Sequence, residues 1–278
     1  MWVDDPPALV KTDSYWSRLR NLGVEVAALM VDSTARGFGL IYSVRDLSVI
    51  AELARQHDIG LVATVWPEPS PRAIDAMVAG LEPILGLGFI GLENDVEMNW
   101  RTDKVRGFPS LDAAAVYLTS KERELCNRHD LSLEMTTHTG HREAGPRAFL
   151  ARLVDRVYYQ LYSTESDWQG RPVAWDGPRG PGTLQREFIQ QVLQDISELG
   201  VEDQFDVELA AGLAFYDQRW SGHSVEEALN LAYNAVKVSG IRSIRGWSSK
   251  WTAGVRSQST TQLEVSAWLQ REFGVTKG

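Results

Sequence analysis

Short apolar stretches alternate along the chain with longer segments in which apolar residues recur every three or four positions. The short stretches are typical of strands buried on both faces, and the longer segments are typical of helices with one buried face. The predicted strands are 1–5, 24–31, 61–66, 89–97, 131–136, 156–162, 205–211 and 241–247. The predicted helices are 13–22, 110–129, 146–154, 183–199, 224–238 and 259–273, with two further helices that begin after Ser43 and Ser70.

Serine residues mark where several of these helices begin. Ser43 and Ser224 each stand three positions before an acidic residue, which is the spacing of a capping box. Ser70 precedes a proline, which favours the first turn of a helix. Glycine follows four of the helices, at Gly23, Gly60, Gly200 and Gly240, where it favours their termination.

Strand and helix alternate about eight times with no linker between them. This alternation predicts parallel strands joined by helical crossovers. Eight units in 278 residues favour a single (β/α)8 TIM barrel domain over residues 1–278. No glycine-rich dinucleotide motif or Walker loop follows a strand, which disfavours an open nucleotide-binding sheet.

Three acids stand two residues apart in the predicted strand 89–97: Glu93, Asp95 and Glu97. Successive side chains of a strand point to opposite faces, so these three share one face. Like charges that share an apolar strand repel one another, and burial adds a desolvation cost. The row therefore indicates a functional site.

Composition restricts the partners. The formal net charge of −9 disfavours nucleic acid and an anionic membrane surface, whereas a neutral polysaccharide fits. We expect a monomer that needs no cofactor.

Cys126 is the single cysteine, so no internal disulfide can form. The first residues resemble no signal peptide, which predicts synthesis in the cytoplasm and leaves release by another route open.

Enzymes with a (β/α)8 barrel carry their chemistry at the C-terminal ends of the strands. Besides the three acids, the predicted strands place there Asp32, Trp66, Thr136, His138, Gln160, Tyr162 and Trp247. Alternation directs Gln160 and Tyr162 into the barrel together. Glycoside hydrolysis needs one carboxylic acid that stays protonated and a neighbour that stays ionised. We expect Glu97 to be the acid, because it lies nearest the end of its strand, and Asp95 to be its partner.

Glu93 is the deepest acid of the row and needs a partner of opposite charge. Arg245 faces inward by alternation on the last predicted strand, and we take it as that partner. Glu208 also lies in an apolar strand. It either faces the interior with the acids or pairs with a helix outside.

Three segments resemble one known family. Residues 91–97, GLENDVE, resemble the fourth-strand motif DGxDxDxE of family 18 glycoside hydrolases. Residues 155–162, DRVYYQLY, and 247–251, WSSKW, resemble the sixth and eighth strands of its plant class III chitinase branch. The sequence departs from the motif at Ile90 and Glu93, where the family has aspartates. These departures indicate a diverged enzyme.

The resemblance implies cleavage of β-1,4 bonds in an N-acetylhexosamine polymer, with the substrate's own acetamido group attacking the anomeric carbon. Glu97 would protonate the leaving group and then activate water. Asp95 would orient the acetamido group, which Gln160 and Tyr162 would hydrogen-bond. Trp247 would stack beneath the sugar ring, and Asp32, Trp66 and Glu93 would complete the site.

Residues 95–97, DVE, also resemble the corresponding strand of family 25 lysozymes, which cleave peptidoglycan. That family has an early aspartate on its first strand, and Asp4 or Asp5 could stand in for it. This second resemblance implies peptidoglycan as the polymer.

Two other functions stay open. One is a metal-dependent barrel hydrolase that uses Asp32, Glu93, Glu134 and His138, with His141 close in sequence. The other is a glycan-binding protein without catalysis, because a fold does not fix a function.

Overall fold

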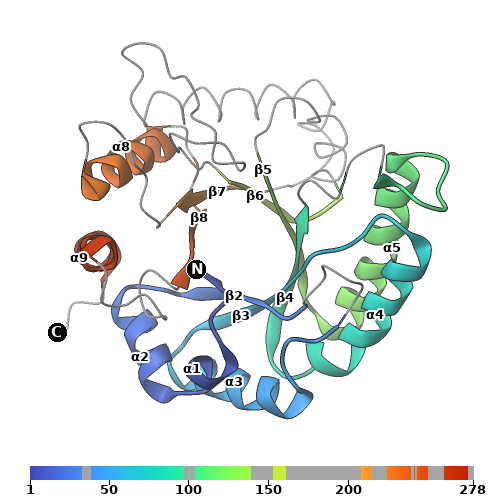
Figure 1. Ribbon diagram of the computed structural model, residues 1–278, viewed down its shortest axis with the longest axis horizontal. Helices are drawn as coiled ribbons and strands as arrows, with labels where there is room; N and C mark the ends of the chain where they lie inside the picture. The colour runs from blue at the N-terminus through green and yellow to red at the C-terminus, as the bar shows by residue number, and fades with distance from the viewer. Residues whose placement is uncertain are drawn as a thin grey trace.

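The computed structural model describes residues 1–32, 39–96, 100, 104–138, 153–160, 208–214, 224–238, 241, 243–249 and 260–274. Eight strands follow one another in chain order in a single sheet, and each is parallel to the next. They are β1 (Trp2–Val3), β2 (Val26–Met30), β3 (Gly60–Val65), β4 (Phe89–Val96), β5 (Ser132–His138), β6 (Arg156–Gln160), β7 (Glu208–Ala214) and β8 (Ser243–Trp247). The sheet curves into a nearly closed barrel, so the predicted (β/α)8 TIM barrel is confirmed (Figure 1).

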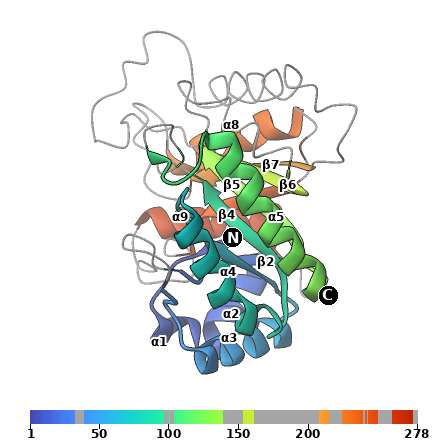
Figure 2. The same cartoon turned by 90° about the vertical axis from the view of Figure 1, so that its right-hand side faces the viewer.

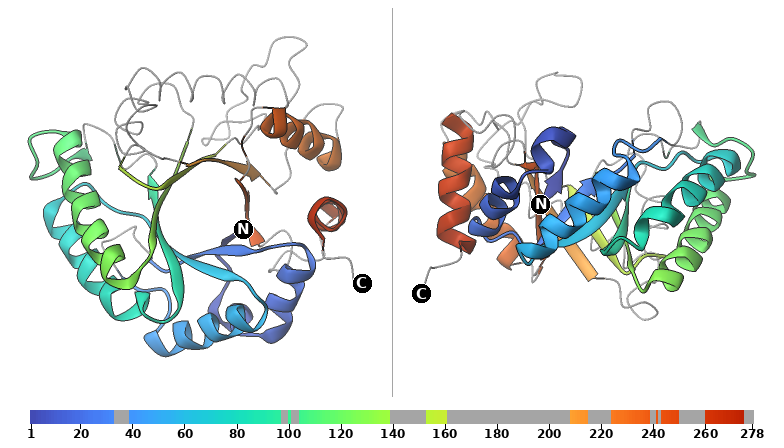
Figure 3. Two further views of the ribbon diagram at one scale, coloured as in Figure 1. Left: turned by 180° about the vertical axis from the view of Figure 1, so that it is seen from behind. Right: turned by 90° about the horizontal axis from the view of Figure 1, so that it is seen from below.

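The described helices lie outside the sheet (Figures 1 and 3). They are α1 (Pro7–Val10), α2 (Asp13–Asn21), α3 (Val44–Gln56), α4 (Pro71–Leu85), α5 (Leu111–His129), α8 (Val225–Val238) and α9 (Thr260–Phe273). No described helix is long and apolar enough to cross a bilayer. The predicted helices 146–154 and 183–199 lie almost wholly outside the described residues.

The predicted helix starts at Ser43 and Ser224 are confirmed. The Ser43 side chain accepts a hydrogen bond from the Asp46 amide at 3.1 Å. The pair at the start of α8 is reciprocal: the Glu227 amide donates to Ser224 Oγ at 3.2 Å, and the Ser224 amide donates to Glu227 Oε2 at 2.7 Å. Each cap satisfies backbone donors that have no partner inside the helix.

Two local predictions were wrong. Residues 7–10 form the short helix α1, which is absent from the predicted helices. β7 extends to Ala214, three residues beyond its predicted end, and includes Gly212. A Cβ on Gly212 would lie 2.8 Å from the Trp2 ring, so this position in the strand needs glycine because Trp2 occupies the space.

The seam between β1 and β8 closes the barrel. Within the described residues these two strands share no backbone ladder, since the ladders run only from β1 round to β8. Side chains join the strand ends instead: Ser248 Oγ donates to Asp4 Oδ1 at 3.0 Å, and Ser249 Oγ donates to Asp5 Oδ2 at 2.6 Å.

Apolar residues fill the space between strands and helices, while the described residues place a small apolar cluster inside the barrel. That inner cluster consists of Trp2, Ala28, Val62, Tyr158 and Ala210, with Val26 packed against it. Most other inward side chains of β4 to β8 are polar or charged. The side chains inside a (β/α)8 barrel stack in layers. The inner apolar cluster fills one part of this interior, and polar residues fill the other layers.

Candidate active site in the barrel interior

Glu93 and Asp95 lie on the interior face of β4, as alternation predicts. Glu93 is fully buried and Asp95 is 5% exposed. In register, Glu93 pairs with Glu134 of β5 and Asp95 pairs with Thr136. Glu97 follows the last described residue of β4 and lies outside the described residues. Two acids of the row therefore share the inner face, and the third stays a prediction.

Three donors hold the Glu93 carboxylate. Trp2 Nε1 donates to Oε1 at 2.7 Å, and Thr64 Oγ1 donates to the same oxygen at 3.2 Å. The guanidinium of Arg245 donates to Oε2, which confirms the partner predicted from alternation. Because hydrogen bonds engage both of its oxygens, the Glu93 side chain is fixed inside the barrel. It thereby anchors β4 two residues before Asp95.

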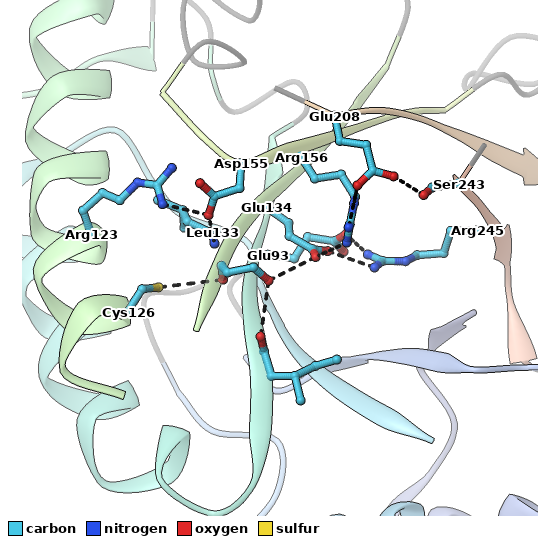
Figure 4. Close-up of polar contacts among 12 residues, drawn as sticks. Glu93, Arg123, Cys126, Leu133, Glu134, Asp155, Arg156, Glu208, Ser243 and Arg245 are labelled. Atoms are coloured by element: carbon cyan, nitrogen blue, oxygen red, sulfur yellow. Dashed lines mark hydrogen bonds and ion pairs between the residues drawn. The ribbon is translucent and has the colours of Figure 1, made fainter. Parts of the chain in front are cut away.

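Arg245 also binds a second carboxylate, and the contacts continue round the barrel. We call the set Glu93, Glu134, Arg156, Glu208 and Arg245 the interior ion network. Arg245 Nη2 donates to Glu134 at 2.9 Å, and Arg156 donates to Glu134 at 2.7 Å. Figure 4 shows Arg156 reaching on to Glu208, at 2.7 Å, and Ser243 beside Glu208. Glu208 thus takes the first of its two predicted alternatives, on the interior face.

Opposite charges in this network compensate for burial. Desolvation lowers the pKa of Arg245 to about 9, which still leaves the guanidinium charged near neutral pH. The guanidinium also lies 3.8 Å from the centroid of the Tyr158 ring, a cation–π contact. Desolvation raises the pKa of Glu134, and Arg156 counteracts the effect. An acid network without these two arginines would be costly to bury.

Asp95 lies above Glu93 and meets Gln160 of β6. Gln160 Nε2 lies 3.5 Å from Asp95 Oδ1 and 3.4 Å from Thr136 Oγ1. Gln160 is buried, which confirms that it faces inward. Tyr162 lies outside the described residues, and of Trp247 and His138 only the backbone is described. The structure thus brings together one acid and one amide of the predicted site.

Asp32 and Trp66 follow the ends of β2 and β3, the two strands that precede β4 in the sheet. Asp32 is 2% exposed and accepts a hydrogen bond from the Gly39 amide at 2.9 Å. Its backbone also bridges to Leu40, so Asp32 contacts residues 39 and 40 through both its side chain and its backbone. Trp66 is half-buried directly after β3.

Sequence reasoning missed Trp100, which follows the acid row in the chain. Its side chain is fully buried, and Nε1 donates to the Pro67 carbonyl at 2.9 Å. The Trp100 side chain is therefore anchored to the segment after β3. Its position three residues after Glu97 was the available signal.

Asp4 and Asp5 differ in role. Asp5 is buried and accepts hydrogen bonds from Tyr15 at 3.0 Å and from Ser249 at 2.6 Å, so its carboxylate is committed to the seam. Burial, and then the Asp5 charge, raise the pKa of Tyr15 well above its usual value. Asp4 is half-buried and continues the inward face begun by Trp2. Of the two, Asp4 is the one placed to face the barrel.

The predicted metal ligands do not form a common site in the described part of the chain. No group of three His, Cys, Asp or Glu side chains there is arranged to hold a metal ion. Arg245 binds both Glu93 and Glu134, so a positive charge already occupies the space between these carboxylates. His141 lies outside the described residues.

No family model matches this sequence, and no curated protein sequence does. Solved structures with a similar fold include a beta-mannanase from the blue mussel Mytilus edulis, with a TM-score of 0.57, 11% identity, and coverage of 99% of this chain and 90% of that one. A family 18 N-acetylglucosaminidase from Paenibacillus barengoltzii has a TM-score of 0.57, 10% identity, and coverage of 93% and 95%. A family 18 chitinase from Flavobacterium johnsoniae has a TM-score of 0.56, 9% identity, and coverage of 92% and 91%. At these identities the likeness establishes the fold.

Proposed function

We propose that the protein is a glycoside hydrolase that cleaves β-1,4 bonds in an N-acetylhexosamine polymer. One observation carries the proposal: Asp95 is buried on the inner face of β4, two residues before Glu97, with the Gln160 amide 3.5 Å from its carboxylate. This arrangement agrees with the family 18 resemblance of the sequence. The fold shared with two family 18 enzymes adds support, although other glycosidases share it too.

In the proposed reaction, the carbonyl oxygen of the substrate's acetamido group attacks the anomeric carbon. Glu97 donates its proton to the departing glycosidic oxygen, so the bond breaks without a free alkoxide. Water then attacks the anomeric carbon and breaks its bond to the acetamido oxygen, which restores the acetamido group, and the ionised Glu97 takes up the proton that the water loses. The two displacements together retain the configuration at the anomeric carbon.

The neighbours of Glu97 have separate proposed roles. Asp95 orients the acetamido group and stabilises the positive charge that develops on it. Gln160 holds Asp95 and, with Tyr162, hydrogen-bonds the acetamido group. Trp247 stacks beneath the sugar ring, and Trp66 contributes a second aromatic surface. Asp32 contributes a substrate-binding carboxylate after β2.

Glu93 takes a supporting role in this proposal. Both of its oxygens are bound by Trp2, Thr64 and Arg245, so it is not available to the substrate. It fixes the lower part of β4 and thereby the position of Asp95 two residues later. The glutamate that departs from the family motif is thus matched by an arginine on β8.

Chitin oligosaccharides and purified peptidoglycan test the proposal, with mass spectrometry to identify the new reducing end. We expect hydrolysis by the wild-type protein and a loss of about 10²–10⁴-fold in Glu97→Gln. Glu124→Gln is the matched control, because Glu124 is exposed on α5 and paired with Arg128 on the same helix. Full activity in Glu97→Gln would refute the role of Glu97, and binding of the glycan without any product would instead indicate a glycan-binding protein.

Peptidoglycan is the second candidate substrate, and Asp4 favours it. Asp4 is half-buried at the end of β1 on the inward-facing side, and Ser248 donates to it at 3.0 Å. An acid on the first strand is the feature that the family 25 resemblance calls for. The same digest separates the two candidates, because chitin oligosaccharides and peptidoglycan are separate substrates and each is scored for product.

A further inference from the structure

Asn94 of β4 points away from the barrel, between the inward-facing Glu93 and Asp95. It meets Glu122 of α5, and both side chains are buried, at 2% and 0% exposed. Asn94 Nδ2 donates to Glu122 Oε2 at 2.7 Å. Figures 1 and 2 show α5 and α4 side by side outside β4, so this contact lies between the strand and its covering helices.

Each partner has one further buried oxygen. Asn94 Oδ1 and Glu122 Oε1 have no hydrogen-bond partner among the described residues. Both oxygens are acceptors when Glu122 is ionised, and two buried acceptors without donors are costly. A single proton on Glu122 Oε1 would remove both deficits by donating to Asn94 Oδ1, which would close a ring of two hydrogen bonds between the two side chains.

Among the described residues, Arg123 is the cation whose charge acts on Glu122, and it lowers the pKa of Glu122 less than burial raises it. Arg123 is next in sequence, but its guanidinium binds Asp155 at 2.7 Å (Figure 4). It also donates to the Leu153 carbonyl at 3.2 Å. Cys126, one turn along α5, is a buried thiol whose pKa burial raises to about 12.

The charged groups of α4 that face α5 are also engaged. Asp75 pairs with Lys121 and Tyr117, and Glu82 pairs with Arg128 and His129. From β4, only the neutral amide of Asn94 reaches Glu122.

We propose that Glu122 is protonated in the native protein and is a positioning residue: its closed pair with Asn94 fixes the register of β4, so that Glu93 and Asp95 face the barrel interior. A one-residue slip of β4 would turn both acids toward α5 and bring Asn94 inside. A protonated Glu122 on α5 can accept a hydrogen bond from the Asn94 amide and donate one to it. It offers no positive charge to a carboxylate, so it disfavours a register in which Glu93 and Asp95 face α5. Burial raises the pKa of Glu122 to about 8, in agreement with the geometry.

Carbon-13 NMR of protein labelled at the glutamate side-chain carboxyl tests this pair directly. Glu122→Gln identifies the Glu122 signal by its loss, and Glu124→Gln on the same helix is the matched control. We expect the Glu122 signal to have the shift of a protonated acid at pH 6 and to titrate with a midpoint of about 8. A carboxylate signal at pH 6 would overturn the proposal.

The same spectra test positioning through Glu93, whose carboxyl is also labelled. We expect its signal to move with the Glu122 midpoint in the wild type and to stay constant in Glu122→Gln, which keeps a neutral pair with Asn94. A Glu93 signal that does not change as Glu122 titrates would overturn the positioning role.

If Glu122→Gln does not fold, Asn94→Ala replaces it. Loss of the Asn94 hydrogen bond should raise the titration midpoint of Glu122 further, and an unchanged midpoint would contradict the proposed pairing of Asn94 with Glu122. None of these readouts depends on hydrolysis.

Discussion

Arg245 binds Glu93 across the barrel interior, from β8 to β4, although the two residues are 152 positions apart in sequence. The same guanidinium binds Glu134 of β5 at 2.9 Å. One arginine therefore connects the strand that carries the candidate acids with the last strand of the barrel. A buried charge pair of this kind is sensitive to loss of one partner, because the other is left unpaired.

We predict that Arg245→Met destabilises the protein by about 3–5 kcal/mol, since it leaves Glu93 and Glu134 buried without their shared cation. Urea unfolding followed by circular dichroism measures the change. Arg271→Met is the control: Arg271 is about half exposed and pairs with Glu226 on the surface, so its loss should cost less than about 1 kcal/mol. Equal effects of the two substitutions would contradict the structural role of the interior pair.

We predict that Gly212→Ala destabilises the protein by about 1–3 kcal/mol through overpacking. The new Cβ would lie 2.8 Å from the ring of Trp2 and would push that ring away from Glu93. Gly86→Ala at the end of α4 is the control, because its nearest neighbour would be 3.6 Å away and its φ is −71°. Thermal unfolding compares the stability of the two variants. An unchanged unfolding temperature in Gly212→Ala would show that the Trp2 side chain can shift to make room for the new Cβ.

We predict a graded effect at the seam. Asp5→Ala deprives the buried hydroxyls of Tyr15 and Ser249 of their shared acceptor and should cost about 1–3 kcal/mol. Ser249→Ala removes only one donor and should cost about 0.5–1.5 kcal/mol. Denaturant unfolding of both variants checks the order, and the reverse order would show that the Asp5 carboxylate does not join the strands.

We predict that the free energy of unfolding falls as pH rises from 5 to 9. Glu122 has a pKa of 4.5 when unperturbed and about 8 when folded, so the native state binds more protons between these values. Its contribution is complete below the lower value and is lost as pH passes the higher one, with a slope of at most about 1.4 kcal/mol per pH unit. Urea unfolding at a series of pH values measures the slope.

Glu122→Gln should flatten this pH dependence, because the amide keeps both hydrogen bonds and does not titrate. Glu124→Gln should follow the wild-type curve, since Glu124 is exposed on the same helix. Parallel curves for the wild type and Glu122→Gln would contradict the prediction.

We predict that Asp95→Asn lowers kcat on chitin oligosaccharides by about 10²–10⁴-fold with a smaller change in KM, because an amide stabilises a developing positive charge poorly. Steady-state kinetics with reducing-end detection gives both constants. Asp112→Asn, an exposed aspartate in the first turn of α5, is the matched control. Unchanged kcat in Asp95→Asn would remove Asp95 from the reaction.

The sequence predicted the barrel and the facing of β4 because both depend on local periodicity. Alternation alone placed Glu93, Asp95, Gln160 and Arg245 inside, and the pairing of Glu93 with Arg245 followed from charge. The end of β7 was wrong because Gly212 signals a break locally, while the need for it comes from Trp2 at the other end of the chain. The seam contacts of Asp5 and the Pro67 contact of Trp100 were missed for the same reason.

The sequence did not single out Asn94, which faces outward between Glu93 and Asp95, because its partner Glu122 is 28 positions away on α5. Asn94 has no periodic or charge signal of its own. Glu97, Tyr162 and the ring of Trp247 belong to the candidate site on sequence grounds alone, as they lie outside the described residues and side chains.

The seam has a consequence for how the barrel fluctuates. A sheet closed by a continuous backbone ladder has no edge at which strand separation can start, whereas hydroxyl–carboxylate contacts at the seam separate one at a time. Amide protons of β1 and β8 should therefore exchange with solvent sooner than those of β3, β4 and β5, which have backbone ladders on both sides. The candidate acids thus sit in the slowest-exchanging part of the sheet, and opening of the barrel begins on the side away from them.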